Sequence, residues 1–119
     1  MKAGAAQGVA ARFVSGLWRG YYEQIGRRFR QEQTMEFADG MLRGEGRDDL
    51  GPFRIEGQYR VEGTAVRVGW IKTYDGRHSV LYLGALDGGW IRGAWRLQGD
   101  EGDNFAFAPE SVAGAEGFA

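Results

Sequence analysis

Lys72 is the side chain whose type and position best suit chemistry. It is one of only two lysines among 15 basic residues, and the alternation that runs through Val68 and Trp70 points it toward the inside of a strand. A lysine removed from water can act as a base or bind the carboxylate of a ligand. Two other placements stay open: Lys72 reaches a carboxylate such as Asp48 at the rim, or a β-bulge near Gly69 turns it to solvent.

His78 is the second candidate, because it is the only histidine and follows the turn Asp75-Gly76. It suits a general base, although a histidine hydrogen-bonded at the rim is the simpler expectation. Ser79 points to the opposite face of the same strand, so the pair is not a nucleophile with its base. No carboxylates have the spacing to complete a metal site with His78. We therefore predict no catalytic residue, no metal and no cofactor, and we favour binding over catalysis.

A set of polar and aromatic side chains shares the inward faces of the expected strands. A mostly apolar cavity with a few convergent polar groups is typical of a ligand site, here for a small apolar or aromatic molecule. The alternative is a filled core in which tyrosine hydroxyls and glutamine amides satisfy one another. A small barrel enzyme that uses Lys72 or His78 is the third possibility. The predicted ligand-binding residues are Tyr22, Gln31, Gln33, Tyr59, Trp70, Lys72, Tyr74, His78, Tyr82 and Trp95.

The elements that must position these residues are strands. Apolar and polar residues alternate, and turn residues interrupt the pattern every 8 to 12 positions, which favours a sandwich or barrel. The connections are too short for parallel crossovers, so neighbours in sequence pair antiparallel. We predict an all-β fold, an eight-stranded antiparallel up-and-down meander β-barrel without edges. Its strands are expected at 16–24, about 28–38, 41–47, 53–61, 65–74, 78–85, 90–97 and about 104–108.

The domain organisation follows from length. A chain of 119 residues has room for one domain, expected at 12–108, with a lead segment at 1–11 and a flexible C-terminal tail at 109–119. The net charge of -1 gives no reason to expect a nucleic acid or a membrane as partner. Cysteine is absent, and the first twelve residues are too weakly apolar for a signal-peptide core, so we expect a cytoplasmic protein.

The outward faces differ in character along the chain. The strands expected at 28–38 to 65–74 carry interleaved Arg and Glu, which suits cross-strand ion pairs on a solvated surface. The three strands expected between 65 and 97 instead place apolar residues outward, which indicates a homo-oligomer interface unless the N-terminal segment covers them. The predicted interface residues are Ile71, Leu81, Leu83 and Trp90.

Gly16-Leu17-Trp18, on the first expected strand and before seven more strands, resembles the calycin group of barrels, which includes lipocalins and avidins. The resemblance implies that a small molecule binds in the mouth of the barrel. In lipocalins this Trp packs at the closed end, often under an Arg from a late strand, and Arg92 or Arg96 is the counterpart here. The chain departs from lipocalins in lacking a Thr-Asp-Tyr turn and an expected C-terminal helix.

Overall fold

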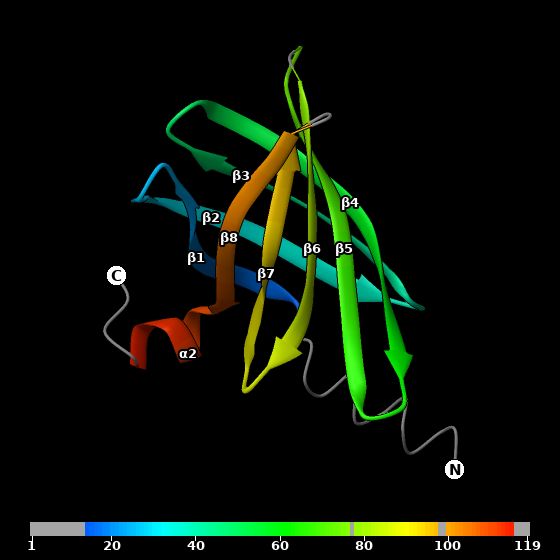
Figure 1. The fold of residues 1–119 in the computed structure, drawn as a ribbon. Helices are drawn as coiled ribbons and strands as arrows, with labels where there is room; N and C mark the ends of the chain where they lie inside the picture. Colours follow the sequence, from blue (N-terminus) through cyan, green and yellow to red (C-terminus); the bar gives the residue numbers. More distant parts are fainter. Residues whose placement is uncertain (1–13, 77, 98–99, 116–119) are drawn as a thin grey trace.

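The computed structural model describes residues 14–76, 78–97 and 100–115 and shows a closed barrel of eight antiparallel strands (Figure 1). Each strand pairs with the next in sequence, and β8 returns to pair with β1, which confirms the predicted meander. The strands are β1 (Gly16–Gln24), β2 (Arg27–Ala38), β3 (Met41–Asp48), β4 (Gly51–Glu62), β5 (Ala65–Tyr74), β6 (Ser79–Asp87), β7 (Trp90–Leu97) and β8 (Asp100–Pro109). The last strand begins four residues earlier than the sequence pattern indicated.

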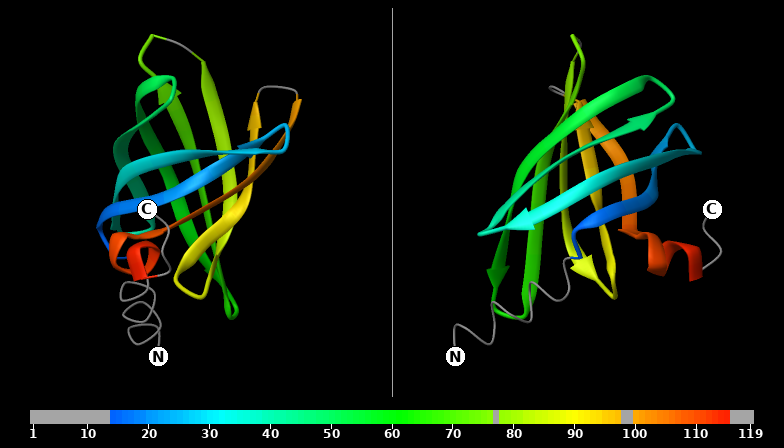
Figure 2. Two further views of the ribbon diagram at one scale, coloured as in Figure 1. Left: turned by 90° about the vertical axis from the view of Figure 1, so that its left-hand side faces the viewer. Right: turned by 180° about the vertical axis from the view of Figure 1, so that it is seen from behind.

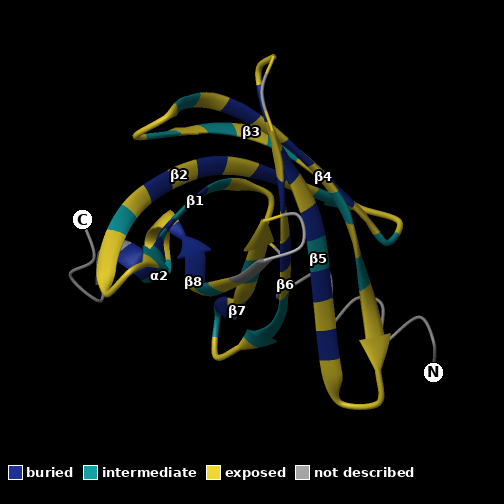
Figure 3. Cartoon of the chain, turned by 45° about the horizontal axis from the view of Figure 1, so that its top comes forward, coloured by how far each residue is buried: buried dark blue, intermediate teal, exposed yellow. Residues whose placement is uncertain are grey.

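Tight turns explain why successive strands pair. Asp39 and Gly40 both have positive φ angles, 52° and 78°, as the two central residues of a type I′ hairpin turn require. Strand β5 pairs with β4 on one side and with β6 on the other, and neither pairing contains a register shift. The alternative of a bulge near Gly69 is therefore wrong, and β5 alternates regularly between buried and exposed residues (Figure 3).

Glycines allow neighbouring strands to approach closely on the inner face. A Cβ atom at Gly57 would lie 1.9 Å from the backbone oxygen of Gly69 and 2.7 Å from the Cβ of Trp70, its cross-strand partner. Gly44 shows the same crowding, with 1.8 Å to the backbone oxygen of Thr34. Strands that carried side chains at these positions would have to separate, so the glycines permit the tight coiling of this small barrel.

Aromatic rings fill the interior. The indole of Trp70 stacks on the ring of Tyr82, with centroids 5.2 Å apart and an angle of 10° between the planes. Phe105 packs edge-on against both, and Phe107 lies 5.5 Å from Phe105. Such offset and edge-on pairs add to the stabilisation that apolar burial supplies. The centre of the barrel is thus occupied by side chains.

A short helix, α2 (Glu110–Ala115), follows β8 on the outside of the barrel (Figure 2). Ala113 is fully buried and packs in one cluster with Trp90, Ala106 and Ala108. The sequence prediction of a flexible tail from residue 109 is therefore wrong for this segment. The predicted lead segment, 1–11, lies outside the described residues. No helix in the described part of the chain has the length and apolar character needed to cross a membrane.

Trp90 is not part of the exposed apolar surface that the sequence predicts as an oligomer interface. It points outward from the barrel as expected, but only 5% of it is exposed, because the helix side chains of Ala113 and Val112 pack in its cluster. Arg92 lies with its guanidinium carbon 5.0 Å from the Trp90 ring centroid and not against Trp18. Arg92, one of the two late-strand arginines that the lipocalin resemblance implied, thus packs on Trp90.

Ile25 carries local strain that a substitution should relieve. This β-branched residue has a φ of 51° in the turn between β1 and β2, and 91% of it is exposed. Asn tolerates the left-handed region, so Ile25→Asn is expected to raise the free energy of unfolding by about 1 kcal/mol. Urea denaturation of both proteins measures the change. Equal stability would show that the Ile25 backbone relaxes without cost.

Candidate functional site

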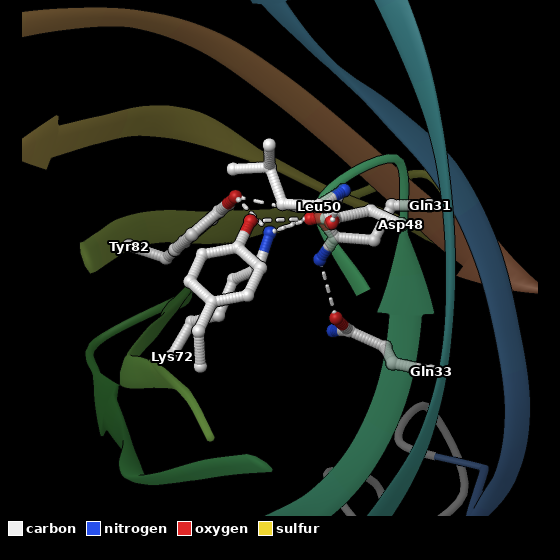
Figure 4. A network of polar contacts seen from close by, with 7 residues as sticks. Gln31, Gln33, Asp48, Leu50, Lys72 and Tyr82 are labelled. Carbon is white, nitrogen blue, oxygen red and sulfur yellow. Dashed lines mark hydrogen bonds and ion pairs between the residues drawn. The ribbon is translucent and has the colours of Figure 1, made fainter. Parts of the chain in front are cut away.

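Lys72 points into the barrel from β5 and is 1% exposed. Its Nζ atom donates to Oε1 of Gln31 at 2.7 Å, to the Tyr82 hydroxyl at 3.4 Å, and to Oδ2 of Asp48 in a close ion pair (Figure 4). An ammonium group has three protons to donate, and these three acceptors lie on three different strands. The inward orientation predicted for Lys72 is thus observed, together with the alternative in which it reaches Asp48.

Asp48 ends β3 and turns its carboxylate into the barrel, where none of its side chain is exposed. Its Oδ1 atom accepts the Leu50 backbone N–H at 2.9 Å, an Asx-turn contact that also shapes the link to β4. Its Oδ2 atom accepts the Tyr74 hydroxyl at 2.5 Å in addition to the Lys72 ammonium. One carboxylate therefore gathers three donors, two from β5 and one from the turn that follows β3.

Aromatic rings surround the Lys72 ammonium. Its nitrogen lies 4.5 Å from the ring centroid of Phe53, 4.7 Å from that of Tyr74 and 5.0 Å from that of Tyr22. Ring faces attract cations, and the attraction grows when water is excluded. Together with Asp48, these rings compensate part of the cost of burying a charged lysine.

Burial shifts the acid–base behaviour of this cluster. Loss of hydration lowers the pKa of Lys72 to about 8, although the Asp48 carboxylate opposes the shift. Burial raises the pKa of Tyr22 to about 12, with the negative charges of Asp48 and Asp49 adding to it. The pKa values of Tyr74 and Tyr82 rise for the same reasons, burial first and Asp48 second. All three tyrosines thus stay protonated over the physiological range.

The two glutamines continue the cluster along β2. Nε2 of Gln31 donates to Oε1 of Gln33 at 2.7 Å, and both residues are buried. Nε2 of Gln33 and Nε1 of Trp70 are buried donors on the inner face that have no hydrogen-bond partner among the described residues. The hydrogen bonds of the polar cluster are therefore complete around Lys72 but incomplete at Gln33 and Trp70. An unpaired buried donor costs free energy, so these two positions lower the stability of the folded state.

The structure brings six of the ten predicted ligand-binding residues into this one cluster, and the other four lie around it or apart from it. Trp70 stacks beneath Tyr82, and Trp95 donates its ring N–H to the Glu23 carbonyl oxygen at 2.9 Å. His78 is exposed, with its ring 5.1 Å from that of Tyr74. Tyr59 packs on Phe37, whose ring in turn lies against that of Trp18. The clustered residues are Tyr22, Gln31, Gln33, Lys72, Tyr74 and Tyr82.

Asp48 and Phe53 belong to the cluster but were not among the predicted site residues. Asp48 follows the strand expected at 41–47, and the sequence indicates for it only the role of a rim carboxylate that Lys72 reaches. Phe53 begins the strand expected at 53–61, and a buried Phe on a strand is the ordinary content of a core. The signal that could have identified Asp48 is the inward lysine itself, because a buried lysine needs a nearby carboxylate. No comparable signal distinguishes Phe53 from other core residues.

A large hollow lies outside the barrel wall. It is a groove of about 1160 Å³ over β4, β5 and β6, with Ile71, Leu81 and Leu83 on its apolar floor. Gly69 lies on the outer face of β5 directly opposite Leu83, and a Cβ atom at Gly69 would lie 3.1 Å from Cδ2 of Leu83, so the leucine side chain packs over this glycine. The groove is bordered by charged residues: Arg54, Glu56, Arg60, Arg67 and Arg92.

A second hollow of about 310 Å³ lies between Phe53, Arg54 and Thr73 near the Lys72 end of the barrel. Among the described residues, no three His, Asp or Glu side chains stand close enough to hold a metal ion.

No protein-family model matches the chain, and no curated protein matches its sequence. The geometry of the barrel and of its outer groove therefore provides the basis for a proposed function.

Proposed function

We propose that the protein is a non-catalytic oligomerisation module, a filled barrel that binds a second copy of itself through the outer groove over β4 to β6. The observation that carries the proposal is the contrast between inside and outside. Side chains fill the interior, whereas three large apolar residues remain exposed together on one wall. Contiguous exposed apolar residues in an open groove mark an interaction surface.

The filled interior is why we favour this function over a ligand inside the barrel. Trp70, Tyr82 and Phe105 stack across the centre, where an apolar or aromatic molecule would have to lie. The donors of Lys72 are all engaged by the chain's own acceptors. Catalysis by Lys72 would first require one of these contacts to open. The observations thus favour the second of the sequence-based hypotheses, a filled core.

The groove suits a two-fold related copy because it is self-complementary. Its floor is continuous, since Ile71 stands directly opposite Leu81 in the β5–β6 ladder. Its border has both signs of charge: Glu56 stands among four arginines, and Glu62, beside the groove, forms ion pairs with Arg60 and Arg67. A symmetric interface places the same patch against itself, so a border of one sign would repel, whereas a mixed border allows Arg to meet Glu.

The fold also supports a calycin-like relationship, which we include in the proposal. The closed eight-stranded meander has the arrangement of that group, and Trp18 on β1 is fully buried at the end away from Lys72. Its ring N–H donates to the Val14 carbonyl oxygen at 2.7 Å, and its ring lies 5.7 Å from that of Phe37. Calycin barrels serve mainly as binding proteins, which agrees with a role in association and not in chemistry.

Leu83→Glu tests the proposed interface. A carboxylate on the groove floor would be buried without a partner on association, so we expect the dissociation constant of the oligomer to rise at least tenfold. Native mass spectrometry and light scattering at several protein concentrations measure the oligomeric state. Val61→Glu is the matched control, because Val61 is also an apolar strand residue, 46% exposed against 48% for Leu83, but lies outside the groove. A wild-type protein that stays monomeric would overturn the proposal.

A further inference from the structure

We propose that the Lys72 end of the barrel is a carboxylate-binding site occupied by the chain's own Asp48, and that a small free carboxylate binds there when Asp48 withdraws. The site consists of Lys72, Tyr74 and the backbone N–H of Leu50, with Phe53 and Tyr22 as walls. This inference does not depend on the oligomerisation proposed above.

The donors are arranged as a receptor for one carboxylate. The Lys72 ammonium and the Tyr74 hydroxyl both donate to Oδ2 of Asp48, and the Leu50 N–H donates to Oδ1. Both oxygens of the carboxylate are therefore bound from converging directions, by groups that bind any carboxylate equally well. The charged donor is buried and the rings of Phe53 and Tyr22 face it, so water competes poorly for it.

The carboxylate is attached at the edge of the barrel, where it can leave. Asp48 is the last residue of β3, and its pairing with Gly51 is the final step of the β3–β4 ladder. The two residues between them, Asp49 and Leu50, are exposed, so their side chains do not fasten the turn to the core. Lys72 and Tyr74, in contrast, lie within β5, which is paired on both sides. Movement of the turn would remove Asp48, together with the Leu50 N–H, and leave the charged donor Lys72 and the hydroxyl of Tyr74 in place.

The chemistry of the site defines the class of ligand. The donors require a carboxylate, and the ring walls favour a small flat or apolar group attached to it. A ligand competes with Asp48, which is tethered next to the donors and so has a high effective concentration. Wild-type affinity for a free carboxylate is therefore low, and removal of the Asp48 carboxylate should raise it.

Chemical rescue of Asp48→Ala tests this inference. The melting temperature is measured at pH 7 in sodium formate or sodium acetate and compared with sodium chloride at the same ionic strength. We expect a lower melting temperature in chloride than for wild type, and a saturable increase in formate and acetate. Wild type should need at least tenfold more carboxylate for any such effect, because Asp48 holds the site.

Two control variants separate specific binding from salt effects. Asp49→Ala removes the adjacent exposed carboxylate and should show neither the loss nor the rescue, while Lys72→Met/Asp48→Ala should lose the rescue. If Asp48→Ala does not fold in chloride, its refolding from urea is compared in the two salts, and folding only in carboxylate supports the inference. Equal behaviour of Asp48→Ala in carboxylate and chloride, or rescue that persists without Lys72, overturns it.

Discussion

Replacing Lys72 with Met is expected to lower the free energy of unfolding by about 3–5 kcal/mol at pH 7. Met matches the length of the lysine stem, so packing changes little. The Asp48 carboxylate, however, loses the Nζ–H donor of Lys72, which even a neutral amine supplies, although none of its side chain is exposed. An unpaired buried charge is among the few defects that cost this much in a single substitution. Urea denaturation of both proteins at pH 7 measures the loss.

The double variant Lys72→Met/Asp48→Leu shows whether the loss comes from the orphaned charge. With both charges replaced by apolar groups, most of the stability should return, because a buried ion pair contributes little net stability over a well-packed apolar pair. Tyr74 loses its acceptor in this variant, so the recovery should be incomplete. A double variant as unstable as Lys72→Met would show that the carboxylate is not the cause.

The pH dependence of stability is the second large expected effect. The folded protein holds the Lys72 proton less tightly than the unfolded chain, because burial lowers its pKa from 10.5 to about 8. Between these values the unfolded state binds more protons, so stability rises with pH. We expect the free energy of unfolding to increase by about 2 kcal/mol between pH 8 and pH 10, where most proteins do not gain stability.

Above pH 10 the sign reverses. Tyr22, Tyr74 and Tyr82 have pKa values raised above the ordinary tyrosine value of 10.0, so the folded state now holds protons that the unfolded chain releases. Their stabilising contribution is complete below pH 10 and is lost as the pH rises further. The profile should therefore have its maximum near pH 10, followed by a steep fall.

Urea denaturation at intervals from pH 7 to pH 11 records this profile, and Lys72→Met provides the control. The variant should lack the rise below pH 10 but keep the fall above it, since it retains the three tyrosines. A wild-type stability that decreases between pH 8 and pH 10 would contradict the prediction. It would mean that the contact with Asp48 outweighs the loss of hydration at Lys72.

Local patterns were sufficient to predict the strands. Along β5 the alternation from Val66 to Tyr74 predicts which residues face inward, and the structure shows these side chains buried. Asp39-Gly40 predicts a tight hairpin by its conformational preference alone. Short links between such strands leave only antiparallel neighbours, so the closed meander follows from information within about ten residues at a time.

The cluster around Lys72 depends on contacts that no local pattern contains. Asp48 is 24 residues from Lys72 in sequence, and Gln31 is 41 residues away. Their meeting requires the register of β2 to β5 together with a turn that directs a carboxylate inward. The sequence allowed Lys72 three placements, and the regular pairing of β5 with both neighbours excluded the one in which a bulge turns it to solvent.

The sequence by itself therefore determined the strand order, the inward faces and the need of Lys72 for a partner, because these depend on alternation and turn chemistry. Tertiary structure alone decided that Asp48 is this partner, that α2 covers Trp90, and that aromatic rings fill the barrel. The physical reason is that side-chain packing and ion pairing depend on distances between strands, whereas alternation depends only on the backbone of each strand.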